Sequence, residues 1–482
     1  MTALPRDRLI LAAIMALALG LRLVGLNGPL WFDEVVTHDT HLRLGWGEML
    51  SSYSMNHHYL HNIAAKLSMS LFGPDPWAIR LPALIFGLGG IWAMWALVRG
   101  IAGSLPAHAT ALLMALSYHH IWFSGNARGY TGLALFSTLG LIFFLKGLRS
   151  GRTADWLWFA AMLALTIFTH LTGAFFFMTL GLVWLGLVAI RAMHGTLDRP
   201  TITGPFLGFL IGGLVTLALY APVIPSLLST VSGVAATSAG DPMQEYQNPL
   251  WTAYEGLRTG LGQAGPLVTL VGLLTAALVT LGAVALRKRE PLFAPVALGH
   301  ILLTIVLLTV VGMRIWPRFF FTDIPFLLFL IVMGVGLICQ WLARLLPDRL
   351  GAVLFPLAIL AMALVSTPLA LRNYSAPKQD LAGAFTQVEA QRTPGERVYA
   401  ISYSGEIFTG HFAADWQTIW TEDDYRTAMA EPGPVTIIVT FPARNLREYP
   451  AIDADMQAGV LGERAYLPGT LGDGGIFLLH RD

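Results

Sequence analysis

Residues 319–341 read FFFTDIPFLLFLIVMGVGLICQW, an apolar stretch that contains a single charged side chain, Asp323. About 20 apolar residues in a helix cross the roughly 30 Å of hydrocarbon in a bilayer, so this stretch predicts a membrane-spanning helix. The rest of the chain has the same character, since 55% of its 482 residues are hydrophobic and only 12% are charged. This composition excludes a water-soluble globular chain and indicates a polytopic membrane protein.

Further windows of the same kind occur along the chain, which predicts about eleven spans in all. The predicted spans are 8–26, 80–99, 104–122, 129–147, 155–171, 173–191, 204–224, 264–286, 293–313, 319–341 and 350–371. Arg6 and Arg8 precede the first span, as in a signal peptide, but no clear small-residue cleavage site follows. We therefore interpret it as a retained helix, which gives an all-α polytopic membrane domain over residues 1–372.

The Lys and Arg residues predict the orientation of these spans, because basic loops are retained on the cytoplasmic side of a membrane. If the N-terminus is cytoplasmic, every predicted inside loop carries positive charge, for example at Arg99, Lys146 and Lys288. An odd number of spans then places the chain from Arg372 onward outside. The sequence predicts a multi-pass plasma-membrane protein whose C-terminal region is external.

Residues 375–482 change in character, because apolar runs become shorter and turn pairs such as Pro394-Gly395 appear. Three short apolar runs predict strands, at 397–402, 434–441 and 475–480. Helical windows alternate with them. We expect a small soluble α/β domain over residues 375–482, on the external side.

Charge and cysteine usage exclude several other classes. The net charge of +1 argues against a nucleic-acid partner, because binding a phosphate backbone needs a clustered basic surface. The single cysteine, Cys339, lies inside an apolar run, so neither a disulfide framework nor a thiolate metal site is expected. The sequence also has no Gly-rich phosphate loop and no H-E-x-x-H motif.

The predicted first external loop, residues 27–79, gathers much of the polar chemistry. It reads GPLWFDE at residues 28–34, so two adjacent carboxylates, Asp33 and Glu34, follow a tryptophan at the bilayer surface. Its later part, 55–72, has the pattern of an amphipathic helix that lies on the membrane. The structural alternative is that the two acids are solvated residues near a helix start and the tryptophan is an ordinary interfacial anchor.

Three arginines are expected at the same outer face: Arg80, Arg128 and Arg318. The planar guanidinium matches phosphate oxygens bidentately, so these side chains are candidates to hold a lipid phosphate. The alternative is that each one extends to the lipid headgroups without binding a substrate.

Several stretches, in this order along the chain, resemble one family. They are Phe32-Asp33-Glu34, Asn56-His57-His58-Tyr59, Arg80-Leu81-Pro82, the segment from Ser124 to Tyr130, Thr169-His170 and Pro317-Arg318-Phe319. Together with the layout of spans, they resemble the GT-C membrane glycosyltransferases of family 39. That family comprises the dolichyl-phosphate-mannose-protein mannosyltransferases and bacterial relatives such as the lipid A aminoarabinose transferases.

The resemblance implies a GT-C fold and transfer of a sugar from a polyprenyl-phosphate donor to a hydroxyl of an external acceptor. A bacterial inner-membrane protein of this kind would act on lipid A, lipopolysaccharide, a cell-envelope glycan or a protein. Asp33 would be the general base and Glu34 a supporting acid, with Arg128, Arg318 and Arg80 as contacts to the donor phosphate. Direct displacement would invert the anomeric centre.

Five further residues are expected to line the substrate cavity: His57, His58, Tyr59, Tyr130 and His170. Histidine and carboxylate together can bind a divalent cation, which keeps such a cofactor as an alternative, but no metal ligands are assigned. Asn126 stands where the family often has an acid, so Asp33 and Glu34 would carry most of the negative charge in the site.

Two other functions fit a polytopic chain: a transporter or flippase of a lipid-linked or small solute, and a ligase or polymerase of lipid-linked glycans. A transporter is disfavoured because the predicted helix interiors from 129 to 371 are nearly free of acidic residues. The sequence also shows no convincing internal repeat.

Overall fold

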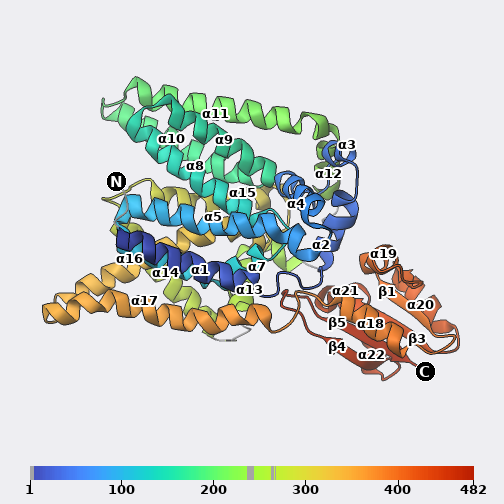
Figure 1. The fold of residues 1–482 in the computed structure, drawn as a ribbon. Helices are drawn as coiled ribbons and strands as arrows, with labels where there is room; N and C mark the ends of the chain where they lie inside the picture. Colours follow the sequence, from blue (N-terminus) through green and yellow to red (C-terminus); the bar gives the residue numbers. More distant parts are fainter. Residues whose placement is uncertain (1–4, 236–243, 262–264, 266) are drawn as a thin grey trace.

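The computed structural model describes residues 5–235, 244–261, 265 and 267–482. A bundle of helices forms the larger part, and the C-terminal α/β domain lies beyond one end of it, beside α2 (Figure 1). The expected combination of a helical membrane domain with a small C-terminal sheet domain is confirmed.

Eight helical segments of the described chain are long and apolar enough to cross a membrane. They are Pro76–Ala102 (α5), Tyr130–Ser150 (α8), Gly173–Met193 (α10), Arg199–Thr230 (α11, η2 and part of α12), Leu267–Leu286 (α14), Phe293–Val311 (α15), Pro317–Ala343 (η4 and α16) and Asp348–Tyr374 (α17 and η5). The predicted spans 8–26 and 155–171 correspond to α1 (Pro5–Leu23) and to the shorter apolar helix α9 (Thr153–Thr169). The predicted span 264–286 starts outside the described residues and is otherwise matched by α14.

The predicted span 104–122 is divided into two helices, α6 (Ser104–Ala115) and α7 (Tyr118–Ser124). Ser117 has an extended backbone between them, and its hydroxyl accepts a hydrogen bond from the amide of His120 at 3.4 Å. Serine is favoured at this N-cap position because it satisfies an amide that the new helix leaves free. The break allows α7 to end at the turn that carries Arg128.

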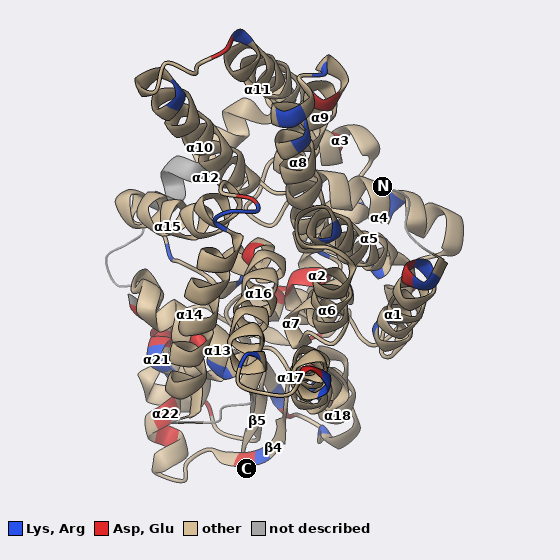
Figure 2. Cartoon of the chain, turned by 90° about the vertical axis from the view of Figure 1, so that its left-hand side faces the viewer, with Lys and Arg blue, Asp and Glu red and all other residues tan. Residues whose placement is uncertain are grey.

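Three of the long segments contain an α-helix with narrower bounds: α11 (Arg199–Tyr220), α16 (Ile324–Ala343) and α17 (Asp348–Leu371). Shorter elements complete the membrane domain: α2 (Phe32–Thr37), the π-helix η1 (His38–Leu42), α3 (Trp46–Ser51), α4 (Tyr59–Phe72), η2 (Ala221–Val223), α12 (Ile224–Ala235), η3 (Gln244–Gln247), α13 (Pro249–Leu261), η4 (Pro317–Asp323) and η5 (Arg372–Tyr374). The helix α4 corresponds to the amphipathic helix expected at 55–72. Figure 2 views the bundle from the end opposite the C-terminal domain and shows Lys and Arg at the loops that join α8 to α9 and α10 to α11.

Helices α14 and α16 pack so closely that their backbones touch. A Cβ atom added at Gly282 would lie 1.9 Å from the carbonyl oxygen of Leu330, and one at Gly334 would lie 2.1 Å from that of Leu278. Small residues permit this approach in membranes, where van der Waals packing rather than the hydrophobic effect holds helices together.

The C-terminal domain has a five-stranded mixed sheet in the order β2-β1-β3-β5-β4. Strands β1, β2 and β3 are parallel, whereas β5 runs antiparallel to both β3 and β4. Its elements are α18 (Leu381–Gln391), β1 (Arg397–Ile401), α19 (Tyr403–Gly410), β2 (Gln417–Ile419), α20 (Glu422–Ala430), β3 (Val435–Thr440), α21 (Pro442–Glu448), α22 (Pro450–Gln457), β4 (Gly462–Leu467) and β5 (Ile476–Arg481). The three predicted strands are β1, β3 and β5, the central strands of the sheet.

Alternate residues of the central strands enter two separate hydrophobic cores. Val398 packs with α18 and α19 on one face, and Tyr399 packs with α20 and α22 on the other. Val35 of α2 is 1% exposed and belongs to the first of these cores, and the Phe32 ring lies 5.2 Å from that of Phe441. The helix that carries Asp33 therefore belongs to the hydrophobic core of the C-terminal domain as well as to the membrane domain.

The glycine contacts of α14 and α16 predict that a glycine-to-alanine change destabilises the protein, although alanine favours helices. Alanine raises helix propensity by up to about 1 kcal/mol, yet Gly282→Ala and Gly334→Ala should lower the midpoint of thermal unfolding, because each new methyl group meets a carbonyl oxygen. Gly213→Ala in α11 is the matched control, since a Cβ there meets nothing within 4 Å. Unfolding of the purified protein in detergent measures this, and equal midpoints for all three variants would contradict the close packing.

Candidate active site

A buried ion pair between Glu34 and Arg80 joins the start of the first external loop to α5. Glu34 is 0% exposed, and its Oε1 and Oε2 accept hydrogen bonds from Nε and Nη2 of Arg80 at 2.8 and 2.6 Å. The amide of Ala127 donates to Oε1 at 2.7 Å, and that of Trp31 donates to Oε2 at 3.3 Å. This one carboxylate therefore holds together α2, α5 and the turn after α7.

Arg80 has no N–H left for a substrate. Its Nη1 donates to the carbonyls of Leu26 and Gly28 at 2.8 and 2.7 Å, and Nη2 donates to that of Pro29 at 2.8 Å. A guanidinium has five N–H donors, and with the bonds to Glu34 all five are used. In this arrangement Arg80 fixes the chain that leads into α2, and its expected contact with the donor phosphate stays a prediction.

The surroundings of Glu34 keep its carboxylate ionised. Burial alone would raise its pKa, but the charges of Arg80 and Lys378, with the hydrogen bonds from Arg80 and the Ala127 amide, lower the pKa to about 2. The carboxylate is ionised and fully paired at neutral pH.

Asp33 lies between two arginines that come from distant parts of the chain. Its Oδ2 is 3.6 Å from Nη2 of Arg128 and 3.7 Å from Nη1 of Arg318. The Asp33 side chain is 22% exposed, whereas its neighbour Glu34 is buried. Both distances are longer than hydrogen bonds, so the carboxylate oxygens keep lone pairs for another group. Asp33, Arg128 and Arg318 thus form an open cluster, as the sequence predicts.

The two arginines of this cluster still have N–H groups to donate. Nη1 of Arg128 donates to the carbonyl of Asn56 at 3.3 Å, and the guanidinium of Arg318 lies 5.1 Å from the centre of the Trp316 ring. Within the described residues, the Nε atoms of both arginines are buried without a hydrogen-bond partner. An anion placed beside Asp33 would supply the missing acceptor oxygens.

His57 and Tyr59 are buried by packing and by hydrogen bonds. His57 bonds to the carbonyl of Met49 at 2.9 Å and to the side-chain amide of Asn62 at 3.2 Å, so both ring nitrogens are engaged. The Tyr59 hydroxyl donates to the carbonyl of Ser52 at 2.6 Å, and its ring stacks on Phe168. Neither ring presents an open face to a sugar, in contrast to their expected role in the cavity.

His58, Tyr130 and His170 form a second aromatic group. The His58 ring lies 4.7 Å from that of His170 and 5.2 Å from that of Tyr130. Burial and the charge of Arg128 lower the pKa of His58 well below its usual value, so this imidazole is neutral. His170 is half-buried and its Nδ1 accepts a hydrogen bond from the Thr172 amide at 3.2 Å. These three side chains are the expected cavity residues that the structure brings together.

Two further polar residues contact the segments around Glu34, and of these Lys378 has no motif in the sequence. Lys378, in the linker to the C-terminal domain, donates to the carbonyl of Gly125 and lies 5.3 Å from the Trp122 ring. Burial lowers the pKa of Lys378 to about 7, with Glu34 opposing this shift and Arg80 adding to it. Asn126 accepts a hydrogen bond from the indole N–H of Trp31 at 3.1 Å.

A candidate metal centre lies elsewhere. In the part of the chain that the structure describes, one group of three His, Cys, Asp or Glu side chains is close enough to share an ion: His38, Asp39 and His411. The histidines expected in the substrate cavity, His57, His58 and His170, do not belong to this group.

The chain shares its whole fold with solved structures of membrane glycosyltransferases. ArnT from Cupriavidus metallidurans, in the apo state, matches with a TM-score of 0.54 and 14% identity over 97% of both chains. The same protein bound to undecaprenyl phosphate matches at 16% identity. The oligosaccharyltransferase AglB from Archaeoglobus fulgidus, in complex with an inhibitory peptide and a dolichol-phosphate, matches with a TM-score of 0.56 and 11% identity, over 98% of this chain and 74% of that one.

In sequence, residues 56–225 match the family of dolichyl-phosphate-mannose-protein mannosyltransferases. The chain therefore has the fold of ArnT and AglB, and part of its sequence matches the mannosyltransferase family. No curated protein matches its sequence. The matched segment contains Arg80, Arg128 and His170, whereas Asp33 precedes it and Arg318 follows it. The structure brings residues from all three regions into one site.

The buried ion pair predicts a large effect of neutralising Glu34. Glu34→Gln leaves the buried charge of Arg80 uncompensated, which should destabilise the fold by about 3–5 kcal/mol and lower the thermal unfolding midpoint in detergent. Glu48→Gln, an exposed carboxylate of the same loop, is the control and should leave the midpoint unchanged. Similar midpoints for the two variants would show that the ion pair does not hold α2 in place.

Proposed function

We propose that this chain transfers a sugar from a polyprenyl-phosphate donor to a hydroxyl group of an acceptor, with Asp33 as the general base. The observation that carries the proposal is the position of the Asp33 carboxylate, 3.6 Å from Arg128 and 3.7 Å from Arg318. A sugar joined to a lipid phosphate is already activated. Its transfer needs a base for the attacking hydroxyl and cations for the departing phosphate, and these three side chains supply both.

The pairing of Glu34 supports an inverting reaction. A retaining mechanism uses two carboxyl groups, of which one attacks the sugar and the other exchanges protons. Of the adjacent acids only Asp33 is available, because Glu34 is buried against Arg80. One carboxylate that activates the acceptor hydroxyl is sufficient for direct displacement with inversion.

The arginines explain how donor binding would prepare the base. Phosphate oxygens accept strong hydrogen bonds from guanidinium groups, so a bound phosphate draws Arg128 and Arg318 toward itself. Asp33 is then no longer paired with the arginines, and its carboxylate is free to accept the proton of the attacking hydroxyl group. The ArnT and AglB structures, which contain undecaprenyl phosphate and a dolichol-phosphate, support this class of donor.

The distribution of charge supports an external site. Basic loops lie at the end of the bundle opposite the C-terminal domain, and positive charge is retained on the cytoplasmic side (Figure 2). Asp33 and the C-terminal domain then face outward from a bacterial inner membrane. Lipid A, lipopolysaccharide, an envelope glycan or a protein would supply the acceptor hydroxyl there.

Asp33→Asn should abolish transfer without loss of folding. Removing a general base typically lowers the rate by about 10²–10⁴-fold, while asparagine keeps the size of the side chain. The measurement is consumption of a labelled polyprenyl-phosphate sugar by purified protein, beside the unfolding midpoint. Glu48→Gln is the control, and wild-type turnover by Asp33→Asn would remove Asp33 from the mechanism.

Arg128→Ala should weaken the use of the lipid donor specifically. Loss of a charged hydrogen bond of about 1.5–3 kcal/mol corresponds to a roughly ten- to hundredfold increase in KM for the donor. Arg314→Ala is the comparison, since its guanidinium lies over the Trp316 ring, and its donor KM should change less. An effect of Arg128→Ala confined to the acceptor would assign this arginine to the acceptor site.

A further inference from the structure

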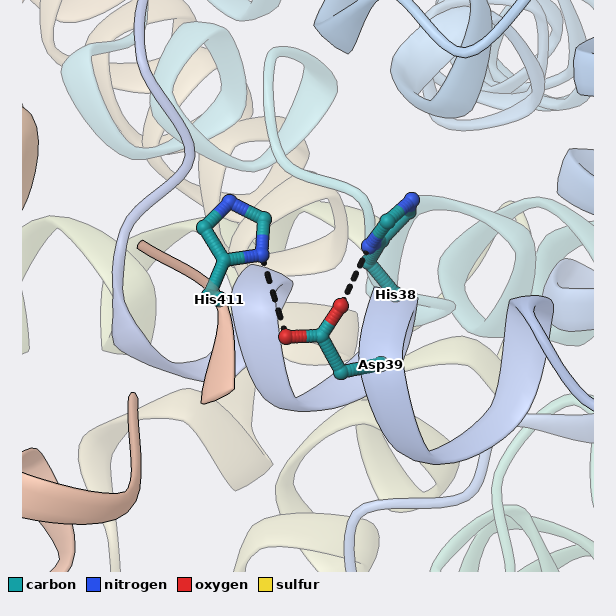
Figure 3. A group of neighbouring side chains, drawn as sticks. All are labelled: His38, Asp39 and His411. Atoms are coloured by element: carbon teal, nitrogen blue, oxygen red, sulfur yellow. Dashed lines mark hydrogen bonds and ion pairs between the residues drawn. The ribbon is translucent and has the colours of Figure 1, made fainter. Parts of the chain in front are cut away.

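Three side chains with metal-binding chemistry meet where the first external loop touches the C-terminal domain (Figure 3). Nδ1 of His38 is 2.7 Å from Oδ1 of Asp39, and Nδ1 of His411 is 3.0 Å from Oδ2 of the same carboxylate. The three candidate ligand atoms lie within 4.8 Å of one another.

The fold brings these residues together from separate elements. His38 and Asp39 open the π-helix η1, directly after α2, and His411 follows the last residue of α19. Single turns of π-helix occur often at functional sites. The His38, Asp39 and His411 side chains are 15%, 24% and 23% exposed, so an ion from solvent can reach them although the core of the domain lies beneath.

The donor atoms fit a transition metal better than a hard cation. Two imidazoles and one carboxylate are ligands that Zn²⁺ commonly takes, whereas Mg²⁺ and Ca²⁺ favour oxygen alone. Bonds of about 2.0–2.2 Å place tetrahedral ligands roughly 3.3 Å apart. The two distances to Asp39, 2.7 and 3.0 Å, are slightly shorter than this, so small rotations of the rings would admit an ion.

Arg43 is the charged group that faces this cluster. Its Nη1 lies 3.6 Å from Oδ1 of Asp39, and its side chain is 62% exposed. An exposed ion pair contributes about 1 kcal/mol or less, so the arginine can turn toward solvent at small cost when a cation binds.

We propose that His38, Asp39 and His411 bind one Zn²⁺-like divalent ion, which joins the C-terminal domain to the loop that carries Asp33. Three protein ligands leave a fourth position for water. The ion lies outside the Asp33, Arg128 and Arg318 cluster and acts by fixing the position of the two domains. This inference does not depend on which reaction the cluster performs.

Metal content tests the proposal directly. The full-length protein in detergent is treated with EDTA, dialysed against Zn²⁺ and then against metal-free buffer, and its zinc is measured by plasma mass spectrometry. We expect one ion per chain in the wild-type protein and a loss of that ion in His411→Ala and in Asp39→Asn. His194→Ala, which removes an exposed histidine after α10, is the control and should keep it.

Two further measurements on the wild-type protein keep the test valid if a variant fails to fold. Co²⁺ should give the visible absorption of a four-coordinate site, and added Zn²⁺ should raise the unfolding midpoint of the EDTA-treated protein. Absence of bound zinc, or the same zinc content in His411→Ala as in the wild-type protein, would overturn the proposal. The three residues would then be a hydrogen-bonded contact only, and the assignment of Asp33 would stand unaffected.

Discussion

The buried ion pair between Glu34 and Arg80 is the interaction on which the geometry of the site depends. Two opposite charges at 2.6 Å in a dry environment tolerate little movement, because any separation exposes an unpaired charge to a medium that does not solvate it. Arg80 also donates hydrogen bonds to three carbonyls of the preceding loop, and Glu34 accepts one from the Ala127 amide. The position of Asp33 relative to Arg128 follows, since one is next to Glu34 and the other is next to Ala127.

The two adjacent carboxylates, Asp33 and Glu34, therefore have different environments. Hydrogen bonds on both oxygens hold Glu34 in place, whereas the Asp33 carboxylate makes two long ion pairs within the described residues. Rigid support next to an incompletely paired group is the arrangement that electrostatic catalysis favours, because the reacting group needs no reorganisation.

The sequence predicts those features that depend on local composition. The long apolar helices and the strands β1, β3 and β5 follow from continuous hydrophobic runs, and the cluster of Asp33, Arg128 and Arg318 follows from loops placed on one face of a membrane. The short edge strand β2 and the half-exposed strand β4 lack such a run, and so were not predicted. The pairing of Arg80 with Glu34 and the contact of Lys378 with Gly125 arise only from tertiary packing, which no local pattern encodes. The boundaries of the two domains, at 372 and 375, stay predictions.

Helix α2 packs in the membrane domain and in the core of the C-terminal domain, which constrains how the C-terminal domain can change in evolution. Val35 is buried among residues of α18, β1 and β5, and Phe32 contacts Phe441. A helix encoded more than three hundred residues earlier therefore contributes to the hydrophobic core of the C-terminal domain. If the C-terminal domain determines the preference for an acceptor, exchanging this domain alone would not transfer that preference. Residues 30–36 would have to change together with this domain. Sequence changes in the C-terminal domain are therefore constrained by the segment that carries the proposed base.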